Sequence, residues 1–176
     1  MKKRKTKIIH RNPWWDYKVD LTPINNGRET GYYYGDSHGN SMIIPITKNG
    51  KFILIKQRRY LRNKMSWEFP SGWISCGETP RQTAHRELEE ESCHQTKELH
   101  ILKRFEVLPG IFKNTCYLFV AKKVEKIDDC KIADREIKET AYYSFKEVQN
   151  LIKKNKIWSG GTLAAWAILN NQYKKK

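Results

Sequence analysis

Short apolar runs separated by polar turn residues predict a series of β-strands through the middle of the chain. Ser41–Thr47 and Lys51–Arg59 are β-rich, and Lys48-Asn49-Gly50 between them is a hairpin signal. Three later segments have the same character: Leu99–Leu108, Cys116–Val124 and Thr140–Tyr143. We therefore expect a sheet that begins with a hairpin and gains further strands later in the chain.

The first forty residues are aromatic and rich in turn-forming residues. The run Tyr32-Tyr33-Tyr34 suits a strand, and it lies between the turn signals Asn26-Gly27 and His38-Gly39-Asn40. We predict a small N-terminal antiparallel strand pair here. Residues 1–40 would form a basic tail and a strand extension, without independent folding, and residues 41–176 would form the main domain.

Capping patterns predict where the helices begin. Thr79 is a suitable N-cap, Pro80 suits the first helical position, and Gln82 completes a capping box. A second capping box at Ser144–Glu147 opens a helix, and Ser159–Thr162 precedes a last one. Strands that alternate with such helices predict an α/β (α+β) fold, a mixed sheet covered by helices on both faces.

Three carboxylates gather on one side of the helix that begins at Pro80. Glu87, Glu90 and Glu91 are spaced i, i+3 and i+4, so they lie within about one turn of each other. Like charges at this spacing repel, and one interpretation is a solvated acidic face offset in part by Arg86. The other is a divalent metal site, because hard ions such as Mg²⁺ bind carboxylate oxygens. The residues alone leave both open.

The spacing of these residues resembles the Nudix box, the signature of Nudix hydrolases. Gly72 is followed after five residues by Glu78, and after seven more by the run Arg86-Glu87-Leu88-Glu89-Glu90-Glu91. Two positions depart from the family pattern, since Cys93 replaces a glycine and His94 an aliphatic residue. The resemblance implies a Nudix-type α-β-α sandwich with a mixed central sheet. The glycine normally serves the helix C-terminus, so Cys93 makes the end of the helix the uncertain feature.

Features outside the box resemble the branch of ADP-ribose pyrophosphatases and nucleoside-diphosphate-sugar hydrolases. Gln57-Arg58-Arg59 precedes a Trp-Glu-x-Pro segment, and a proline stands beyond the box. By this resemblance the substrate-binding residues are Arg59, Glu68 and Pro109. The chain departs from the branch at Asn114, where a glutamate is frequent. The branch also implies a homodimer formed through the N-terminal strands.

The resemblance also implies a metal site and a catalytic set. Mg²⁺, or alternatively Mn²⁺, would be bound by Glu87, Glu91, Glu90 and the Ser71 carbonyl. The catalytic set comprises Glu136, Glu90, Glu78 and Arg86, in which Glu78 and Arg86 pair to brace the loop against the helix. Glu136 is the first candidate for orienting the attacking water, before Asp134 and Glu139. The alternative for these three is an exposed acidic loop.

Composition adds an ambiguous charge signal. The chain has 34 Lys and Arg against 19 Asp and Glu, a formal charge of +15, and part of it lies in the terminal runs MKKRKTK and YKKK, read as solvated tails. The surplus could attract polyphosphates or nucleic acid, or it could reflect composition without function. No stretch has the length and apolarity of a membrane span, and the four widely spaced cysteines predict reduced thiols in a cytoplasmic protein.

We therefore expect an enzyme that hydrolyses a nucleoside diphosphate linked to another group, either ADP-ribose or a nucleotide sugar. One alternative is an RNA 5′-end pyrophosphohydrolase, which the basic surplus favours. A second alternative is a non-catalytic nucleotide-binding regulatory module on the same scaffold.

Overall fold

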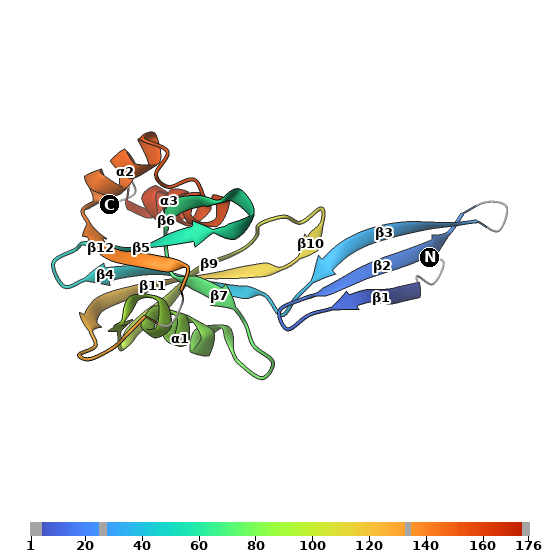
Figure 1. Cartoon of the computed structure of the whole chain (residues 1–176), viewed down its shortest axis with the longest axis horizontal. Coiled ribbons are helices and arrows are strands. Elements are labelled where there is room, and N and C mark those ends of the chain that lie inside the picture. Colours follow the sequence, from blue (N-terminus) through green and yellow to red (C-terminus); the bar gives the residue numbers. More distant parts are fainter. Residues whose placement is uncertain (1–4, 25–27, 133–134, 174–176) are drawn as a thin grey trace.

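Strands make up most of the secondary structure in the computed structural model, which describes residues 5–24, 28–132 and 135–173 (Figure 1). The strands are β1 (Lys5–Arg11), β2 (Asp16–Pro23), β3 (Glu29–Asp36), β4 (Asn40–Thr47), β5 (Phe52–Arg59), β6 (Lys64–Glu68), β7 (Ser71–Trp73), β8 (His94–Gln95), β9 (Glu98–Glu106), β10 (Phe112–Lys113), β11 (Thr115–Lys126) and β12 (Ile137–Tyr143). The helices are α1 (Pro80–Ser92), α2 (Phe145–Lys153) and α3 (Gly160–Tyr173), with a 3-10 turn at Tyr60–Arg62. The predicted mixed α+β class is confirmed. None of the helices in the described ranges has the length and apolarity needed to cross a membrane.

The body sheet has eight strands, and the hairpin of β4 and β5 divides it into two halves, here called the two sheets. Gly50 occupies the turn with a φ of +74°, and Ile46 pairs with Phe52 beside it. The two strands then separate. β4 pairs with β7 and runs parallel to β11, whereas β5 runs antiparallel to β6 and β12. The predicted hairpin is confirmed, and its opening creates a space between the two sheets.

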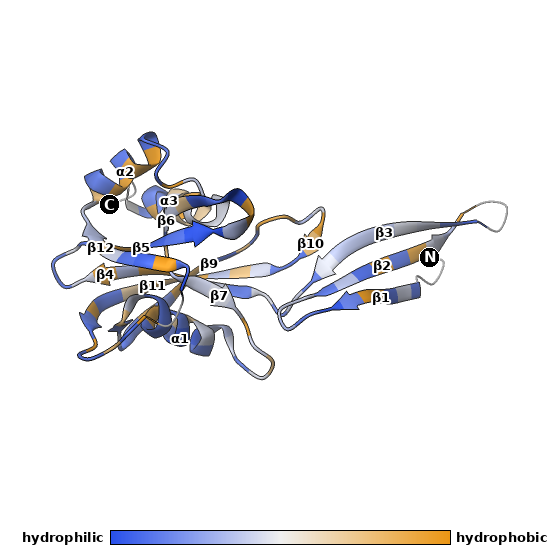
Figure 2. Cartoon of the chain, in the orientation of Figure 1, coloured by the Kyte–Doolittle hydropathy of each residue, from blue (hydrophilic) through white to orange (hydrophobic). Residues whose placement is uncertain are grey.

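Helices cover both faces of these sheets because the strand side chains alternate. Met42 and Ile44 of β4 face one side and join a core that includes Trp166 of α3. Ile43, between them, faces the other side and packs with Leu88 of α1. This period of two on buried strands produces two separate cores and the predicted α-β-α layers. Helix α2 is amphipathic as well: Figure 2 shows both hydrophobic and hydrophilic residues on it.

The N-terminal strands form an arm that projects from the body (Figure 1). β1, β2 and β3 are antiparallel to one another, and β10 joins the body to the arm by pairing in parallel with the end of β3. The predicted strand pair is therefore a sheet of three N-terminal strands. The sequence interpretation was wrong for Lys5–Lys7, which belong to β1 rather than to a solvated tail. The predicted turn at Asn26-Gly27 lies outside the described residues.

Helix α1 begins and ends as its local sequence directs. The Thr79 hydroxyl accepts a hydrogen bond from the backbone N–H of Gln82, and the Gln82 side-chain oxygen accepts one from the backbone N–H of Thr79. Cys93 takes the left-handed conformation after the last turn, with a φ of +56°. Its N–H donates to the Glu89 carbonyl at 2.9 Å. The helix therefore closes in the way a glycine would allow, although a cysteine occupies the position.

A disulfide bond links Cys93 to Cys130, with the two Cα atoms 5.6 Å apart. The expectation that all four cysteines are reduced is therefore wrong for this pair, while Cys76 and Cys116 are free thiols. Sequence spacing gave no signal for the bond because the two residues are 37 positions apart. The cytoplasmic location inferred from reduced thiols stays a prediction. The bond ties the end of α1 to the segment that leads toward β12.

Reduction of this disulfide is expected to destabilise the protein. Closing a loop of this size stabilises a domain by about 2–4 kcal/mol, mainly by restricting the unfolded chain. Thermal unfolding with and without a dithiol reductant measures the effect, and the Cys130→Ser variant should show the lower midpoint under both conditions. Cys76→Ser, which removes an exposed free thiol, serves as the control and should behave as wild type. A wild-type midpoint that does not respond to reductant would contradict the prediction.

Candidate active site

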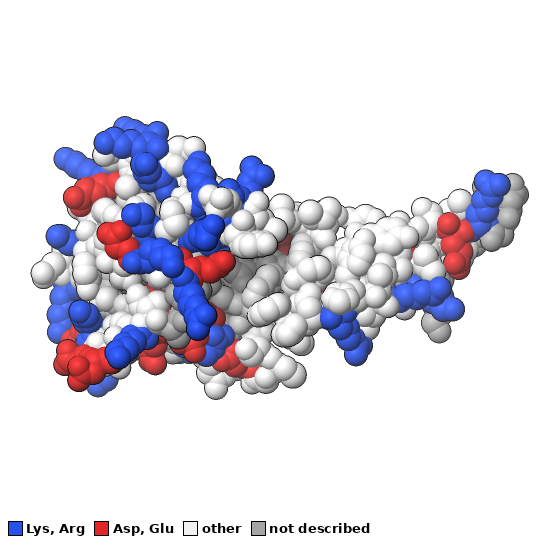
Figure 3. All heavy atoms as spheres, viewed as in Figure 1, with Lys and Arg blue, Asp and Glu red and all other residues white. Residues whose placement is uncertain are grey.

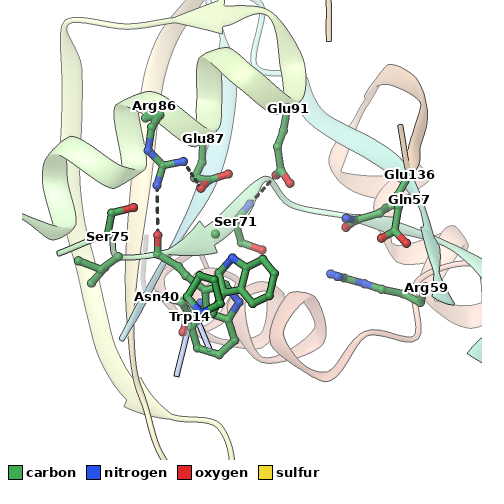
Figure 4. Close-up of a pocket in the computed structure, with 14 residues that line it drawn as sticks. Trp14, Asn40, Gln57, Arg59, Ser71, Ser75, Arg86, Glu87, Glu91 and Glu136 are labelled. Carbon is green, nitrogen blue, oxygen red and sulfur yellow. Dashed lines mark hydrogen bonds and ion pairs between the residues drawn. The ribbon is translucent and has the colours of Figure 1, made fainter. Parts of the chain in front are cut away.

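A cavity of about 570 Å³ opens between the two sheets beside α1 (Figure 4). It is lined by residues from the N-terminal arm, both sheets and the box helix: Pro13, Trp14, Asn40, Gln57, Arg59, Ser71, Gly72, Trp73, Ile74, Ser75, Arg86, Glu87, Glu91 and Glu136. Six of the residues predicted for the site share this space: Arg59, Ser71, Arg86, Glu87, Glu91 and Glu136. The separation of β4 from β5 is what makes room for them.

Glu87 lies directly against the backbone of β7. A Cβ atom at Gly72 would come within 1.9 Å of the Glu87 Oε1 atom, so only glycine permits this approach. The Glu87 side chain is largely buried, and burial raises its pKa, whereas the neighbouring Arg86 opposes that shift. The glycine of the box motif therefore has a steric role, which is to seat a carboxylate beside the strand.

Arg86 connects the box helix to the loop before it. Its guanidinium contacts the Glu78 carboxylate at 2.9 Å, the Glu87 carboxylate at 2.5 Å and the Glu90 carboxylate at 3.1 Å. It also donates to the Trp73 carbonyl at 3.1 Å. Glu78 in turn accepts bonds from Thr83 Oγ1 and the Ser75 N–H. The pairing of Arg86 with Glu78 that the sequence predicted is present in the structure.

The other two box carboxylates have different surroundings. Glu91 is buried, and its Oε2 atom accepts the Ser71 N–H at 2.8 Å. This contact places the Ser71 backbone beside the carboxylate. The Glu90 side chain is half exposed and contacts Arg86. Unlike Arg86, Glu90 does not line the cavity. The helical spacing thus brings Glu87 and Glu91 into the cavity and leaves Glu90 at its margin.

Arg59 enters the cavity from the end of β5. Its guanidinium makes a two-pronged ion pair with Glu68, with Nε and Oε1 2.9 Å apart. Glu68 is fully buried behind it and does not line the cavity. Arg58 points to the opposite face, as alternation along a strand requires, and contacts Asn63. Glu68 therefore holds Arg59 in place, while Arg59 presents its remaining donors to the cavity.

Trp14 reaches the cavity from the turn between β1 and β2. The Asn12 side chain accepts the N–H groups of Trp14 and Trp15 at 2.9 and 3.1 Å, which fixes the turn. Trp15 packs against Phe112, which also contacts Trp73. Trp14 remains 57% exposed, with its ring over the cavity (Figure 4). The turn therefore holds an exposed indole beside the site.

Asn40 lies on the same side of the cavity as Trp14 (Figure 4). The Asn114 side chain donates to the Asn40 amide oxygen at 3.0 Å, and Ser37 donates to Asn114 at 2.9 Å. Asn114, which departs from the branch pattern, therefore acts behind Asn40 and does not itself line the cavity.

Of the three acidic candidates near β12, Glu136 lines the cavity. Its backbone carbonyl accepts the Arg58 N–H at 2.9 Å, which anchors it beside β5. Glu139 is exposed and pairs with Lys56 at 3.1 Å, away from the cavity. Asp134 lies outside the described residues. The assignment of Glu136 to the attacking water stays a prediction.

Pro109 lies apart from this cavity. It borders a second hollow between the arm and the loop before β10, together with Tyr32 and Tyr34. Proline in a turn needs no ligand to explain it. Its assignment to substrate binding stays a prediction.

The residues present fit a divalent metal ion, although their side chains are not arranged around one. In the part of the chain that the structure describes, no three His, Cys, Asp or Glu side chains converge closely enough to hold an ion. Instead, Glu87 and Glu90 form ion pairs with Arg86, and Glu91 accepts a hydrogen bond from the Ser71 N–H. The donor set consists of carboxylate and carbonyl oxygens, which Mg²⁺ prefers, and Gly72 provides the space that seats Glu87.

Sequence reasoning did not assign three of the cavity residues to the site: Asn40, Gln57 and Trp14. The alternation of β5 could have found Gln57, because it shares a face with Arg59 two positions later. No local signal pointed to Asn40 or to Trp14, because their places depend on how the arm meets the body.

Acid is expected to destabilise the protein through Glu78. Hydrogen bonds from Arg86 lower the pKa of Glu78 from 4.5 to about 2, with smaller contributions from Thr83 and Ser75. Because the folded-state pKa is the lower one, the stabilisation is complete above pH 4.5 and is lost as the pH falls toward 2. Thermal midpoints measured across this window should fall more steeply for wild type than for Glu78→Gln. Parallel curves for the two proteins would refute this assignment.

Comparison with known proteins identifies the family. The model of the NUDIX domain matches residues 37–166 of the chain. The methanol dehydrogenase activator of Bacillus methanolicus is 30% identical over 156 residues, which cover 88% of this chain and 84% of that protein. An ADP-ribose pyrophosphatase of Bacillus subtilis (strain 168) is 27% identical over 161 residues, covering 91% of this chain and 86% of that protein.

A solved structure shows the same fold. The crystal structure of an ADP compounds hydrolase matches with a TM-score of 0.80 over 97% of this chain and 92% of that one, at 18% identity. The box spacing, the layers and the family model agree. The chain therefore belongs to the Nudix family, and it resembles the branch of the ADP-ribose pyrophosphatases.

Proposed function

We propose that this protein hydrolyses the pyrophosphate bond of a nucleoside diphosphate linked to another group, either ADP-ribose or a nucleotide sugar. The observation that carries the proposal is the single cavity shared by Trp14, Arg59 and the carboxylates Glu87 and Glu91. An aromatic face, a guanidinium and a candidate metal site are what a nucleobase and a diphosphate require. The similarity to an ADP-ribose pyrophosphatase over most of both chains supports the same substrate class.

The two ends of the substrate would meet different groups. The exposed indole of Trp14 offers a flat apolar face on which a nucleobase can stack. Arg59 offers a forked donor that suits phosphoryl oxygens, and Glu68 holds it in one orientation. Figure 4 shows Glu87 and Glu91 above Trp14 and the Arg59 guanidinium to the right of its ring, so a diphosphate in the cavity would face both the carboxylates and Arg59.

The chain's own residues supply the other requirements of the reaction. Glu87, Glu91, Glu90 and the Ser71 carbonyl would hold Mg²⁺ or Mn²⁺. When bound, such an ion neutralises phosphate charge and lowers the pKa of a water ligand. A cation would also stabilise the ionised form of Glu87, whose pKa burial raises. Glu136, which lines the cavity directly before β12, would accept the proton of the attacking water.

The arm supports a homodimer. Ile8, Ile9, Tyr17, Tyr32 and Tyr33 are large side chains exposed on its strands. Figure 3 shows Lys and Arg concentrated on the body, whereas the middle of the arm is largely uncharged on the face in view. Exposed aromatic and aliphatic side chains on an arm that projects into solvent make the kind of surface that a second copy would cover.

The decisive experiment is turnover with Mg²⁺ on ADP-ribose, nucleotide sugars, nucleoside triphosphates and 5′-triphosphorylated RNA. Glu91→Gln should reduce the rate on the preferred substrate at least about 100-fold, because it removes a charged metal ligand. The fold should be unchanged, since the glutamine oxygen can still accept the Ser71 N–H. Glu89→Gln is the matched control, because Glu89 is an exposed residue of the same helix outside the cavity.

Each outcome of this panel has a defined meaning. Cleavage of ADP-ribose or a nucleotide sugar that Glu91→Gln abolishes and Glu89→Gln retains would support the proposal. Cleavage of RNA alone would replace it with 5′-end processing and give the basic surplus a role. Absence of turnover on every substrate would favour a regulatory binding module.

Sedimentation velocity tests the dimer. The wild type should sediment as a dimer, and Tyr33→Lys should shift it toward the monomer by placing a charge on the arm. Ile101→Lys is the control, because Ile101 is about equally exposed but lies on β9 in the body. A wild-type monomer, or equal effects of both substitutions, would contradict dimerisation through the arm.

A further inference from the structure

The hairpin of β5 and β6 carries two strongly exposed apolar side chains at its turn, here called the apolar tip. Tyr60 is 80% exposed and Leu61 is 91% exposed, and both belong to the 3-10 turn between the strands. They are the two most exposed large hydrophobic side chains in the described ranges, and they are neighbours. Single exposed apolar side chains are ordinary on a protein surface, whereas an adjacent pair at a hairpin turn indicates a surface that a partner covers.

The turn that carries the apolar tip has a fixed conformation. The two strands pair as far as Arg59 and Lys64. Between them, Asn63 takes the left-handed conformation with a φ of +46°, and its N–H donates to the Tyr60 carbonyl at 3.0 Å. The Arg58 guanidinium donates to the Asn63 side-chain oxygen at 2.5 Å. The closed turn therefore presents the apolar tip to solvent.

Positive charge surrounds the apolar tip. The turn after α2 packs beside the hairpin, because the Trp158 indole N–H donates to the Met65 carbonyl at 2.9 Å and the Trp67 N–H donates to the Lys156 carbonyl at 2.9 Å. The Lys64 ammonium lies 5.5 Å from the centre of the Trp158 ring. Five exposed cations on these two segments form what is here called the cationic rim: Arg58, Arg62, Lys64, Lys154 and Lys156.

The cationic rim lacks neutralising carboxylates. Within the described ranges, none of its five members takes part in an ion pair. Two carboxylates on the neighbouring strands are engaged with other cations, since Glu68 is buried behind Arg59 and Glu139 pairs with Lys56. Cations gathered in this way repel one another and attract a partner of opposite charge. The rim therefore predicts an anionic partner.

A lipid bilayer with anionic headgroups accounts for both the tip and the rim. Cations attract the headgroups, and exposed aromatic and aliphatic side chains enter the boundary between headgroups and acyl chains. A nucleic acid would use the cations and could stack on Tyr60, but it gives Leu61 no apolar surroundings. A folded acidic protein would need a pocket shaped to the tip, whereas a bilayer yields around it. Contact of this kind requires no membrane-spanning segment.

We propose that the apolar tip and the cationic rim dock this protein on a membrane surface that carries anionic phospholipids. The tip enters the interface, and the rim cations stay at the level of the headgroups. Arg59, directly before the tip, lines the cavity, so docking would hold the cavity close to the bilayer. The inference goes beyond the proposed hydrolysis and is independent of it, because it concerns a different surface and is read out by binding.

Co-sedimentation with vesicles tests the docking. The wild type should bind vesicles made of equal parts of phosphatidylglycerol and phosphatidylcholine, and it should not bind vesicles of phosphatidylcholine alone. The double variant Tyr60→Ser/Leu61→Ser should bind the anionic vesicles about 10-fold more weakly, because it removes the side chains that enter the interface. Arg62→Gln/Lys154→Gln should also lose about 10-fold, because each cation near an anionic surface contributes to binding.

Matched substitutions elsewhere on the body serve as controls. Ile101→Ser removes another exposed apolar side chain, on β9, and Lys103→Gln/Lys122→Gln removes two exposed lysines of β9 and β11. Both should bind anionic vesicles as wild type does, and every variant should keep the wild-type thermal midpoint, because the substituted side chains are exposed. A loss in the lysine control equal to that of Arg62→Gln/Lys154→Gln would point to general attraction by the formal charge of +15 and overturn the proposal.

An environment-sensitive dye reports whether the tip enters the bilayer. In a Cys76→Ser background, which removes the exposed free thiol, the dye is attached at Leu61→Cys or, as the control, at Ile101→Cys. Emission from position 61 should shift to the blue when anionic vesicles are added, and emission from position 101 should not respond. An unchanged emission at position 61, or no binding to the vesicles, would overturn the proposal.

Fluorescence anisotropy with a labelled single-stranded RNA tests the other polyanion. RNA binding that Arg62→Gln/Lys154→Gln weakens, together with no binding to anionic vesicles, would assign the surface to nucleic acid and overturn membrane docking. A wild type that turns over no nucleotide substrate but docks on anionic vesicles through the tip would overturn only the proposed hydrolysis.

Discussion

The contacts of the Arg86 guanidinium hold the site together. Glu78, Glu87 and Glu90 all meet this one cation, which also binds the Trp73 carbonyl. Without it, the carboxylates of the box helix would repel one another, and the loop before the helix would lose its main anchor. Bonds to Glu78 above all raise the pKa of Arg86, so its charge is permanent. A fixed cation beside the carboxylates lets Glu87 stay buried against Gly72.

A second constraint is the separation of β4 from β5. A continuous sheet would fill the space between these strands with paired backbone and leave no room for a ligand. Because β4 joins β11 and β5 joins β12, one sheet presents Ser71 and Gly72 to the cavity and the other presents Gln57 and Arg59. The groups that would meet a diphosphate in the proposed function thus come from two surfaces that the tertiary fold brings together, and α1 adds Glu87 and Glu91 beside them.

Sequence reasoning succeeded where the determining forces are local. The capping box at Thr79, the hairpin around Gly50 and the helical spacing of Glu87 and Glu91 all depend on residues within a few positions. It failed where distant segments meet. The bond from Cys93 to Cys130 joins residues 37 positions apart, and β1 becomes a strand because β2 pairs with it.

The site divides in the same way. The box motif and the alternation along β5 indicated Glu87, Glu91 and Arg59, which line one cavity, whereas Trp14 reaches it through the turn of an arm whose position no local pattern encodes. The two ends of the cavity therefore differ in chemistry. The Trp14 indole offers an apolar face at one end, and the Gln57 amide offers a neutral hydrogen-bonding group at the other. In the proposed function the nucleobase would stack on the Trp14 indole, and the rest of the substrate would extend past the box carboxylates toward Arg59 and Gln57.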